Sequence, residues 1–289
     1  MTTTTVLRAR FPRAAASLRR YGGAATGPLD DAGRLAWFVL IAARDIPFAV
    51  TRYRRELLRL IAEIGMGTGA LALVGGTAVI MTFVTLSTGS LVAIQGLASL
   101  GQLGIQALLG FVAALINVRL VCPVVAGIVL SSTVGAGATA ELGAMRVSEE
   151  IDALEVMGIN STAYLVSTRT VAGLVVIIPL YALGLVMSFL SPQLVTTLLY
   201  GQAAGTYQHY FSTFLRPSDV FWSFGEAILM AVIVMFSHCY YGYTASGGPV
   251  GVGEAVGRSV RFSLIAVPVV VLMFQMALYG VDPNFAFTV

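Results

Sequence analysis

Long apolar runs, separated by short polar stretches, dominate the pattern of the chain. A helix of about 20 apolar residues crosses a bilayer, so five of these runs predict membrane spans. They lie at residues 66–88, 120–144, 163–190, 218–243 and 262–280. A sixth apolar run, 91–117, is interrupted by four glycines. It either spans fully or enters and leaves the membrane on one side.

The arginines decide between these two topologies. The chain has no lysine, and 11 of its 17 basic residues precede the first span, which favours a cytoplasmic N-terminus. With five spans, Arg146, Arg169, Arg258 and Arg261 lie on the same side as that block, whereas six spans would export all four. We therefore predict five spans, an outer re-entrant segment at 91–117 and a C-terminus outside the membrane.

The residues before the first span divide into two parts. Residues 1–32 are small, polar and basic, which predicts a disordered cytoplasmic tail. Residues 33–63 place apolar and aromatic side chains among arginines, which is typical of an amphipathic helix in the membrane interface. A helix packed on a soluble partner is the alternative. Pro47 is predicted to divide this helix, and residues 64–289 form the transmembrane domain.

A short acidic segment interrupts the membrane pattern at 146–157. Ser148 is a suitable N-cap, Glu149 and Glu150 fall in the first turn, and Gly158 ends the helix. The apolar side chains predicted to share one face are Val147, Ile151, Leu154 and Met157. An anionic inner leaflet repels the acidic opposite face, so a protein partner is preferred over the membrane surface. The residues predicted to make this contact are Arg146, Glu149, Glu150, Asp152, Leu154, Glu155 and Met157.

Small residues recur every four positions in the second span. Gly135, Thr139 and Gly143 form one stripe, and Ala136 and Ala140 belong to the next. Such stripes let helices approach closely, within one bundle or between two subunits. The sequence therefore predicts a packing face here.

Two charged residues are candidates for a polar site within the membrane. Glu226 lies about two to three turns inside the fourth span, where an unpaired carboxylate would cost several kcal/mol. It is therefore paired, protonated or in contact with water. Arg119 lies at the turn before the second span. A polar substrate path and an ion pair between helices are both open interpretations.

Signatures of common enzymes are missing from the sequence. Without a lysine the chain cannot form a Walker A loop, so ATP and Mg²⁺ would bind a partner chain. We predict a non-catalytic chain with no cofactor, no metal site and no nucleic-acid partner. His238 is interpreted as a packed histidine; an intramembrane enzyme using Ser237, His238 and Cys239 is the alternative.

Two stretches carry a resemblance to a known family. ELGAMRVSEEIDALEVMGIN at 141–160, followed by Arg169, and CYYGYTASGGPVGVGEAVGRSV at 239–260 resemble the MlaE/YrbE permeases. The resemblance covers residues 35–280. It implies an all-α integral membrane protein with an interfacial N-terminal helix, about five transmembrane helices and a cytoplasmic coupling helix at 146–157. It also implies two permeases side by side, an ATPase dimer beneath the coupling helices, and lipids exchanged with MCE-domain proteins outside.

The basic N-terminus and the glycine-rich stretch 247–253, predicted to be a cytoplasmic loop, resemble the B-type YrbE subunit of actinobacterial Mce complexes. That resemblance implies a heterodimer with an A-type paralogue. Ser131 to Gly135, Arg119-Leu120-Val121 and Glu226 depart from the family pattern. A partner for Glu226 on the second permease is one hypothesis for the last of these.

The expected function is that of a permease subunit in an ABC-type Mce importer of lipids or fatty acids in the inner membrane. A lipid exporter of the same architecture and a membrane scaffold for MCE proteins are the alternatives. The sequence does not identify the lipid.

Overall fold

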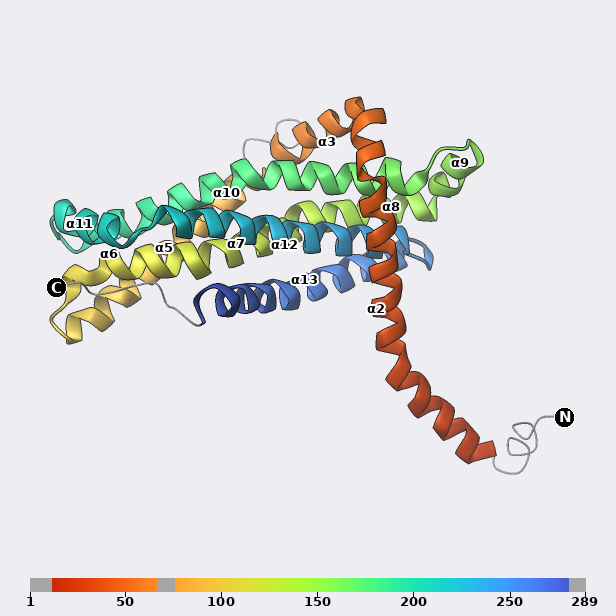
Figure 1. Ribbon diagram of the computed structural model, residues 1–289, viewed down its shortest axis with the longest axis horizontal. Coiled ribbons are helices and arrows are strands. Elements are labelled where there is room, and N and C mark those ends of the chain that lie inside the picture. The colour runs from red at the N-terminus through yellow and green to blue at the C-terminus, as the bar shows by residue number, and fades with distance from the viewer. Residues whose placement is uncertain (1–11, 67–75, 281–289) are drawn as a thin grey trace. The chain divides into compact units, whose positions relative to one another are not determined.

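The computed structural model describes residues 12–66 and 76–280 (Figure 1). The chain forms two compact units that divide between Arg44 and Asp45. The first is helical from Pro12 onward, as part of α2 (Pro12–Arg52). The second begins in the last residues of α2 and holds every other helix described below.

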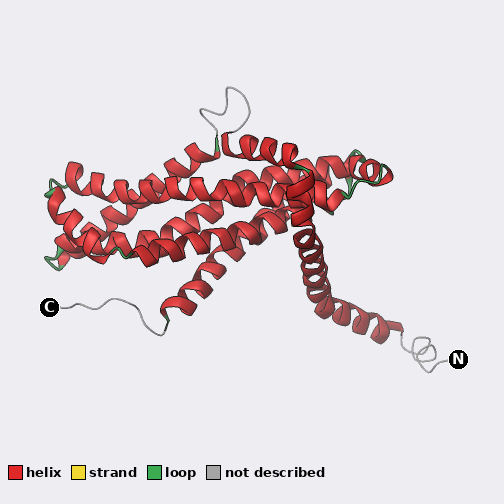
Figure 2. Cartoon of the chain, turned by 45° about the horizontal axis from the view of Figure 1, so that its top comes forward, coloured by secondary structure: helices red, strands yellow, loops and turns green. Residues whose placement is uncertain are grey.

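The second unit contains five helices long and apolar enough to cross a membrane, counted over the described residues, with mean hydropathies between 1.8 and 2.4. They are α5 (Thr77–Gln102), the continuous run Gln106–Val147, the run Thr162–Leu199, α12 (Pro217–Tyr243) and α13 (Gly248–Tyr279). Short loops join them, two of which contain a further short helix, and no strand occurs in residues 12–66 or 76–280 (Figure 2). The predicted fold class, an all-α integral membrane protein with five spans, is confirmed.

Two of the five runs combine α-helical and wider π-helical turns. The run Gln106–Val147 contains α6 (Leu109–Val112), α7 (Cys122–Leu130) and α8 (Ala136–Val147), joined through π-helical segments at Ala113–Val121 and Ser131–Gly135. The run Thr162–Leu199 has α10 (Thr168–Leu194) between two further π-helical segments. In each case the wide turns leave the helix unbroken across the predicted span.

The prediction of a re-entrant segment at 91–117 was wrong. Its first half completes α5, the chain turns at residues 103–105 with Gly104 at φ 72°, and its second half opens the next long helix. A Cβ on Gly96 would lie 2.7 Å from Leu109, and one on Gly101 would lie 2.8 Å from Gln106. These two glycines therefore permit a close approach of neighbouring helices and do not interrupt a span. The predicted start of the first span falls partly at 67–75, outside the described residues.

The N-terminal predictions also need correction. The helix continues through Pro47 and is interrupted at Tyr53, before α3 (Arg54–Met66). Thr51 Oγ1 donates to the Pro47 carbonyl at 3.0 Å, and a proline removes only one backbone donor from a helix. Residues 12–32, predicted to be disordered, are helical; Ala, Leu and Arg in RAAASLRR are strong helix formers. Residues 1–11 of the predicted tail lie outside the described residues.

The glycine-rich stretch predicted to be a loop forms the start of α13. Gly247 and Gly248 take positive φ angles of 93° and 71°, and Pro249 stands in the first turn of the helix. Proline is favoured at that position because its missing N–H would have had no helical acceptor. The fifth long helix therefore begins 14 residues before the predicted span at 262–280.

The helices pack into a bundle in which α10 lies against α5 and α12, and α12 lies against α8 and α13. One core cluster, around Met81, Val118 and Tyr181, joins α5, α10 and the run Gln106–Val147, which we call the second long run. Another, around Leu130, Met235 and Val267, joins that run to α12 and α13. Figure 1 shows α9 (Glu150–Val156) at one end of the bundle and α11 (Ala204–Phe214) at the other. The acidic segment and the connection between the predicted spans at 163–190 and 218–243 thus lie at opposite ends.

Candidate functional site

The acidic segment is a helix end, a sharp turn and a second short helix. Arg146 and Val147 complete α8, and α9 begins only at Glu150. Between them Glu149 has φ 60°, the only positive φ at a non-glycine residue in the described part of the chain. Ser148 does not cap α9; its hydroxyl donates back to the Ala144 carbonyl at 3.0 Å. The prediction of one helix over 146–157 was wrong because α8 continues past Arg146 and the turn falls at Glu149.

Two polar contacts attach α9 to the elements around it. Arg146 Nη1 pairs with Asp152 Oδ1 at 2.6 Å, which holds α9 against the end of α8. Glu155 Oε1 accepts hydrogen bonds from Ser161 Oγ at 2.7 Å and from Tyr243 Oη at 3.1 Å. Tyr243 is the last residue of α12, so Glu155 links the acidic segment to the end of a membrane-spanning helix.

The chain after α9 is attached in the same way. Gly158, at φ 75°, ends the helix as predicted, and the Ile159 amide returns to the Leu154 carbonyl at 3.0 Å. Asn160 Nδ2 and Thr162 Oγ1 both donate to Asp45 Oδ2, at 3.1 and 2.9 Å. The segment is therefore held to the bundle on both sides of α9.

The outward surface of α9 combines carboxylates with apolar side chains. Ile151 is completely buried and Leu154 half-buried, whereas Met157 is 66% exposed and Val156 is 89% exposed. The predicted apolar face is correct for Ile151 and Leu154 and wrong for Met157, because α9 ends one residue before it. We define the coupling surface as the exposed residues Glu149, Glu150, Asp152, Val156 and Met157.

Of the seven residues predicted for a partner contact, Leu154 packs inward and Arg146 is half-buried, and the other five are exposed. Asp152 and Glu155 are exposed and also make contacts within the chain, as Arg146 does. The sequence pattern did not indicate Val156, which lies on the coupling surface, or Tyr243 and Asp45, which hold the segment in place.

The small-residue stripe packs inside the chain. A Cβ on Gly135 would lie 2.8 Å from the ring of His238, and one on Gly143 would lie 2.9 Å from Val252. Thr139, between them, shares a hydrogen bond with His238 Nδ1 at 2.9 Å. This stripe therefore serves contacts of α8 with α12 and α13. Ala140, on the neighbouring stripe, is exposed, and Ala136 is half-buried.

His238 is completely buried, and both ring nitrogens have partners. Nε2 lies 3.1 Å from Ser131 Oγ, and Nδ1 contacts Thr139. Thr139 Oγ1 also lies 3.2 Å from Ser259 Oγ, so the hydrogen bonds that begin at the ring continue to α13. This environment is that of a histidine packed between helices.

A polar cluster joins the two charged residues predicted within the membrane. Arg119 pairs with Asp219 at 2.8 Å and lies over the ring of Tyr279, whose hydroxyl donates to the same carboxylate at 3.1 Å. Gln275 Nε2 donates to Glu226 Oε2 at 3.3 Å and also to the Arg119 carbonyl. Arg119 was predicted at the turn before the second span, but it lies within the long helix Gln106–Val147.

Glu226 is 1% exposed, and its hydrogen-bond donor lies on α13 of the same chain. Its Oε1 atom has no hydrogen-bond partner in the described residues, and a Glu226 partner on a second permease stays a prediction. Asp219, Gln275 and Tyr279 also belong to this cluster and were not predicted. The spacing could have shown them, since Asp219 and Glu226 are seven residues apart on one helix and Gln275 and Tyr279 are four apart on the next.

Five apolar helices of spanning length, with a charged segment fixed across one end, define a multi-pass membrane protein. The family described as Permease MlaE matches residues 67–277, and the chain belongs to that family.

Curated relatives agree with this class. A probable ABC transporter permease protein of Rickettsia bellii is 29% identical over 188 residues, which is 65% of this chain and 73% of that protein. A probable ABC transporter permease protein of Synechocystis is 28% identical over 214 residues, 74% of this chain and 78% of its own length. The protein TRIGALACTOSYLDIACYLGLYCEROL 1, chloroplastic, of Arabidopsis thaliana is 30% identical over 174 residues, 60% of this chain but half of its own.

Proposed function

We propose that this chain is the permease subunit of an ABC-type importer of lipids or fatty acids in the inner membrane. It contributes the membrane path and hydrolyses nothing itself. An ATPase dimer, which binds ATP and Mg²⁺, docks on the coupling surface from the cytoplasm. An A-type paralogue completes a permease heterodimer, and MCE-domain proteins deliver lipid at the outer end. The N-terminus is cytoplasmic and the C-terminus lies outside.

The attachment of α9 is the observation that carries this proposal. Contacts through Arg146, Glu155 and Asn160 connect the coupling surface to α8, α12 and Asp45. A force applied to α9 by a moving partner would therefore reach membrane-spanning helices directly. A segment meant only to lie on lipid would need no such connections.

The nature of the surface supports a protein partner. Val156 and Met157 are exposed apolar side chains on the same short segment as the exposed carboxylates Glu149 and Glu150. Apolar residues surrounded by charges are typical of a protein interface, and the negative charge is repelled by an anionic leaflet. Two curated relatives are named as ABC transporter permeases, which supports an ATPase as that partner. The plant relative is named after a glycolipid, which supports a lipid substrate.

Charge reversal on the coupling surface tests the proposal. The double variant Glu149→Lys and Glu150→Lys should reduce co-purification of the ATPase with the tagged permease by about tenfold or more. The new lysines would face the part of the ATPase that pairs with the two glutamates, and like charges there oppose docking. ATP hydrolysis of the reconstituted complex should fall in parallel. Glu254→Lys is the matched control: it reverses another exposed carboxylate, in the first turns of α13.

Three outcomes count against parts of the proposal. Unchanged ATPase binding in the double variant would refute the assignment of the coupling surface and favour the scaffold alternative. An equal loss in the Glu254→Lys control would show a general effect of charge. ATP-dependent loss of labelled lipid from the inner leaflet, in place of gain, would favour an exporter of the same architecture.

A further inference from the structure

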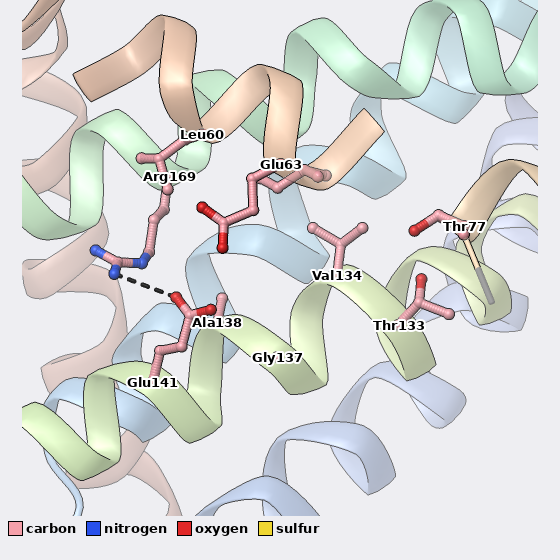
Figure 3. A pocket seen from close by; sticks show the side chains of 11 residues that line it. Leu60, Glu63, Thr77, Thr133, Val134, Gly137, Ala138, Glu141 and Arg169 are labelled. Carbon is pink, nitrogen blue, oxygen red and sulfur yellow. Dashed lines mark hydrogen bonds and ion pairs between the residues drawn. The ribbon is translucent and has the colours of Figure 1, made fainter. Parts of the chain in front are cut away.

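Buried charges in this bundle are paired, with one exception. In the described part of the chain, the arginine, aspartate and glutamate side chains that are buried are Arg169, Asp219 and Glu226. Arg169 pairs with Glu141 at 3.2 Å (Figure 3), and Asp219 pairs with Arg119 at 2.8 Å. Glu226 is the most deeply buried of the three, and its contact is with the uncharged amide of Gln275. Burial of this carboxyl group therefore needs another explanation.

The guanidinium in the same cluster, that of Arg119, is neutralised by a different carboxylate. Its Nε and Nη2 donate to Asp219 Oδ2 at 3.3 and 2.8 Å. The Tyr279 hydroxyl donates to Oδ1 of the same carboxylate at 3.1 Å, and the Tyr279 ring centre lies 3.9 Å from the guanidinium carbon. An ionised Glu226 would therefore add a second negative charge to a cluster whose positive charge is already balanced.

Gln275 distinguishes the two carboxyl oxygens of Glu226. Its amide nitrogen donates to the Arg119 carbonyl and, at 3.3 Å, to Glu226 Oε2. Oε2 is thus an acceptor, whereas Oε1 has no hydrogen-bond partner among the described residues. The space that Glu226 shares with Arg119 and Gln275 is too small for a water molecule. A hydrated ion does not fit there either, but a proton bound to Oε1 needs no additional space.

Titratable and charged groups face Glu226 from several elements. Arg119 belongs to the second long run, Asp219 to α12 itself and Tyr279 to α13. Tyr181 of α10 lies close enough to feel the charge of Glu226. The helix α8 packs against α12 near the other end of that helix, so the charged side chains of α8 are remote. Arg119 is the cation that faces Glu226 in the described part of the chain, and Asp219 balances it.

We propose that Glu226 is a proton-binding site that makes the packing of α12, α13 and the second long run sensitive to pH. Oε1 carries a proton while these helices are packed as in this structure, because a neutral acid is far less costly to bury than an unpaired carboxylate. When the helices separate and water enters, the group releases the proton to water, since a hydrated glutamate is ionised at neutral pH. Acid therefore favours the packed form, and alkali favours the separated form.

The proton-binding site lies away from the acidic segment. Glu226 is nine residues, or about 14 Å, from the first residue of α12, whereas Tyr243 at the other end of α12 contacts Glu155. Tyr279 is the last residue of α13. The proton therefore exchanges with the side of the membrane opposite the coupling surface.

Infrared spectroscopy of the intact complex in nanodiscs tests for the proton. With ¹³C-labelled glutamate, a protonated carboxyl group gives a C=O band that the label shifts. At about pH 7 exposed carboxyl groups are ionised and give no such band. The band should be present in the unchanged chain and absent from Glu226→Gln. Glu141→Gln is the matched control: it removes a carboxylate that is ion-paired with Arg169, so the band should remain.

Hydrogen exchange tests the link to helix packing. After correction for the intrinsic effect of pH, the amides of residues 275–280 should exchange faster as the pH rises, by at most about tenfold per pH unit, because one proton is released on separation. In Glu226→Gln, which resembles the protonated form, the corrected exchange should not depend on pH.

The charge balance itself is tested by Asp219→Asn. This variant leaves Arg119 without its carboxylate, so Glu226 should ionise in its place and lose the band. A band retained in Asp219→Asn would contradict the charge balance on which the site rests.

Two results would overturn the proton-binding site. One is the lack of a Glu226-dependent band at about pH 7, and the other is its loss when the second permease binds, since a cation from that chain would then hold the carboxylate ionised. Equal pH dependence of exchange in Glu226→Gln and in the unchanged chain would refute the effect on packing. These measurements need neither lipid transfer nor ATP hydrolysis, so their failure is distinct from failure of the proposed function.

Discussion

Glu155 provides a direct test of how firmly the coupling surface is attached to the bundle. One carboxylate oxygen accepts from both Ser161, at 2.7 Å, and Tyr243, at 3.1 Å. Glu155→Ala removes this acceptor and with it both hydrogen bonds. Each bond is partly exposed and contributes about 1 kcal/mol, so the docking of α9 should weaken by about 2 kcal/mol, or about 30-fold.

Hydrogen exchange measures this change where it occurs. The amides of Ala153 and Met157 bond to the Glu149 and Ala153 carbonyls within the segment, and they should exchange up to about 30-fold faster in the variant. Glu150→Ala is the control, because the Glu150 carboxylate accepts only from the neighbouring Ser148, at 2.9 Å. In the full transporter, ATP hydrolysis should continue while lipid transfer falls.

A double-mutant cycle shows whether the contact with α12 is responsible. Tyr243→Phe removes one donor, so Glu155→Ala should cost about 1 kcal/mol less in that background. Unaltered exchange of α9 in Glu155→Ala would refute the reasoning. Equal effects of Glu155→Ala in both backgrounds would assign the attachment to another contact.

Two further predictions concern packing and protonation. Gly135→Ala should destabilise the protein by about 1–3 kcal/mol, because the new methyl group would lie 2.8 Å from the His238 ring, which is held by hydrogen bonds at both nitrogens. Gly137→Ala should instead stabilise the protein by up to about 1 kcal/mol, because its methyl group would enter open space and alanine favours the helix. Thermal unfolding in detergent measures both, and equal shifts would contradict the assignment. The hydrogen bond from Arg59 holds the pKa of Glu56 below 4.5, so its contribution to stability is present at neutral pH and is lost as the pH falls through that lowered pKa. Arg59→Gln should return the pKa toward 4.5 in an NMR titration of labelled glutamate, and an unmoved pKa would assign the shift to another group.

The sequence was most informative where apolar length alone decides the structure. The span predicted at 218–243 is α12 at Pro217–Tyr243, because Pro217 marks its start and the apolar run its length. The first two spans were misplaced because Gly96 and Gly101 look like interruptions when seen along the chain. Only the positions of Leu109 and Gln106 opposite them show that they allow close packing.

The acidic segment shows a second limit of prediction from sequence. Its location and the role of Gly158 followed from local pattern, since capping and charge are local properties. The residues that hold it could not follow in the same way. Tyr243 is 88 residues from Glu155, and Asp45 is 115 residues from Asn160. Such pairs are brought together by the packing of the bundle.

The π-helical turn at Ser131–Gly135 gives the second long helix one spare residue. A π-helical turn closes its hydrogen bonds over one residue more than an α-helical turn does. Deleting one residue there can convert the turn to an ordinary α-helical one and leave Glu141 and Arg146 facing as before. The same deletion within α8, before Arg146, would rotate Arg146 and the segment that follows it by about 100° relative to His238, and would separate Glu155 from Tyr243 of α12. The helix therefore tolerates the loss of one residue at Ser131–Gly135, at the level of His238. It does not tolerate the same loss within α8, closer to the coupling surface.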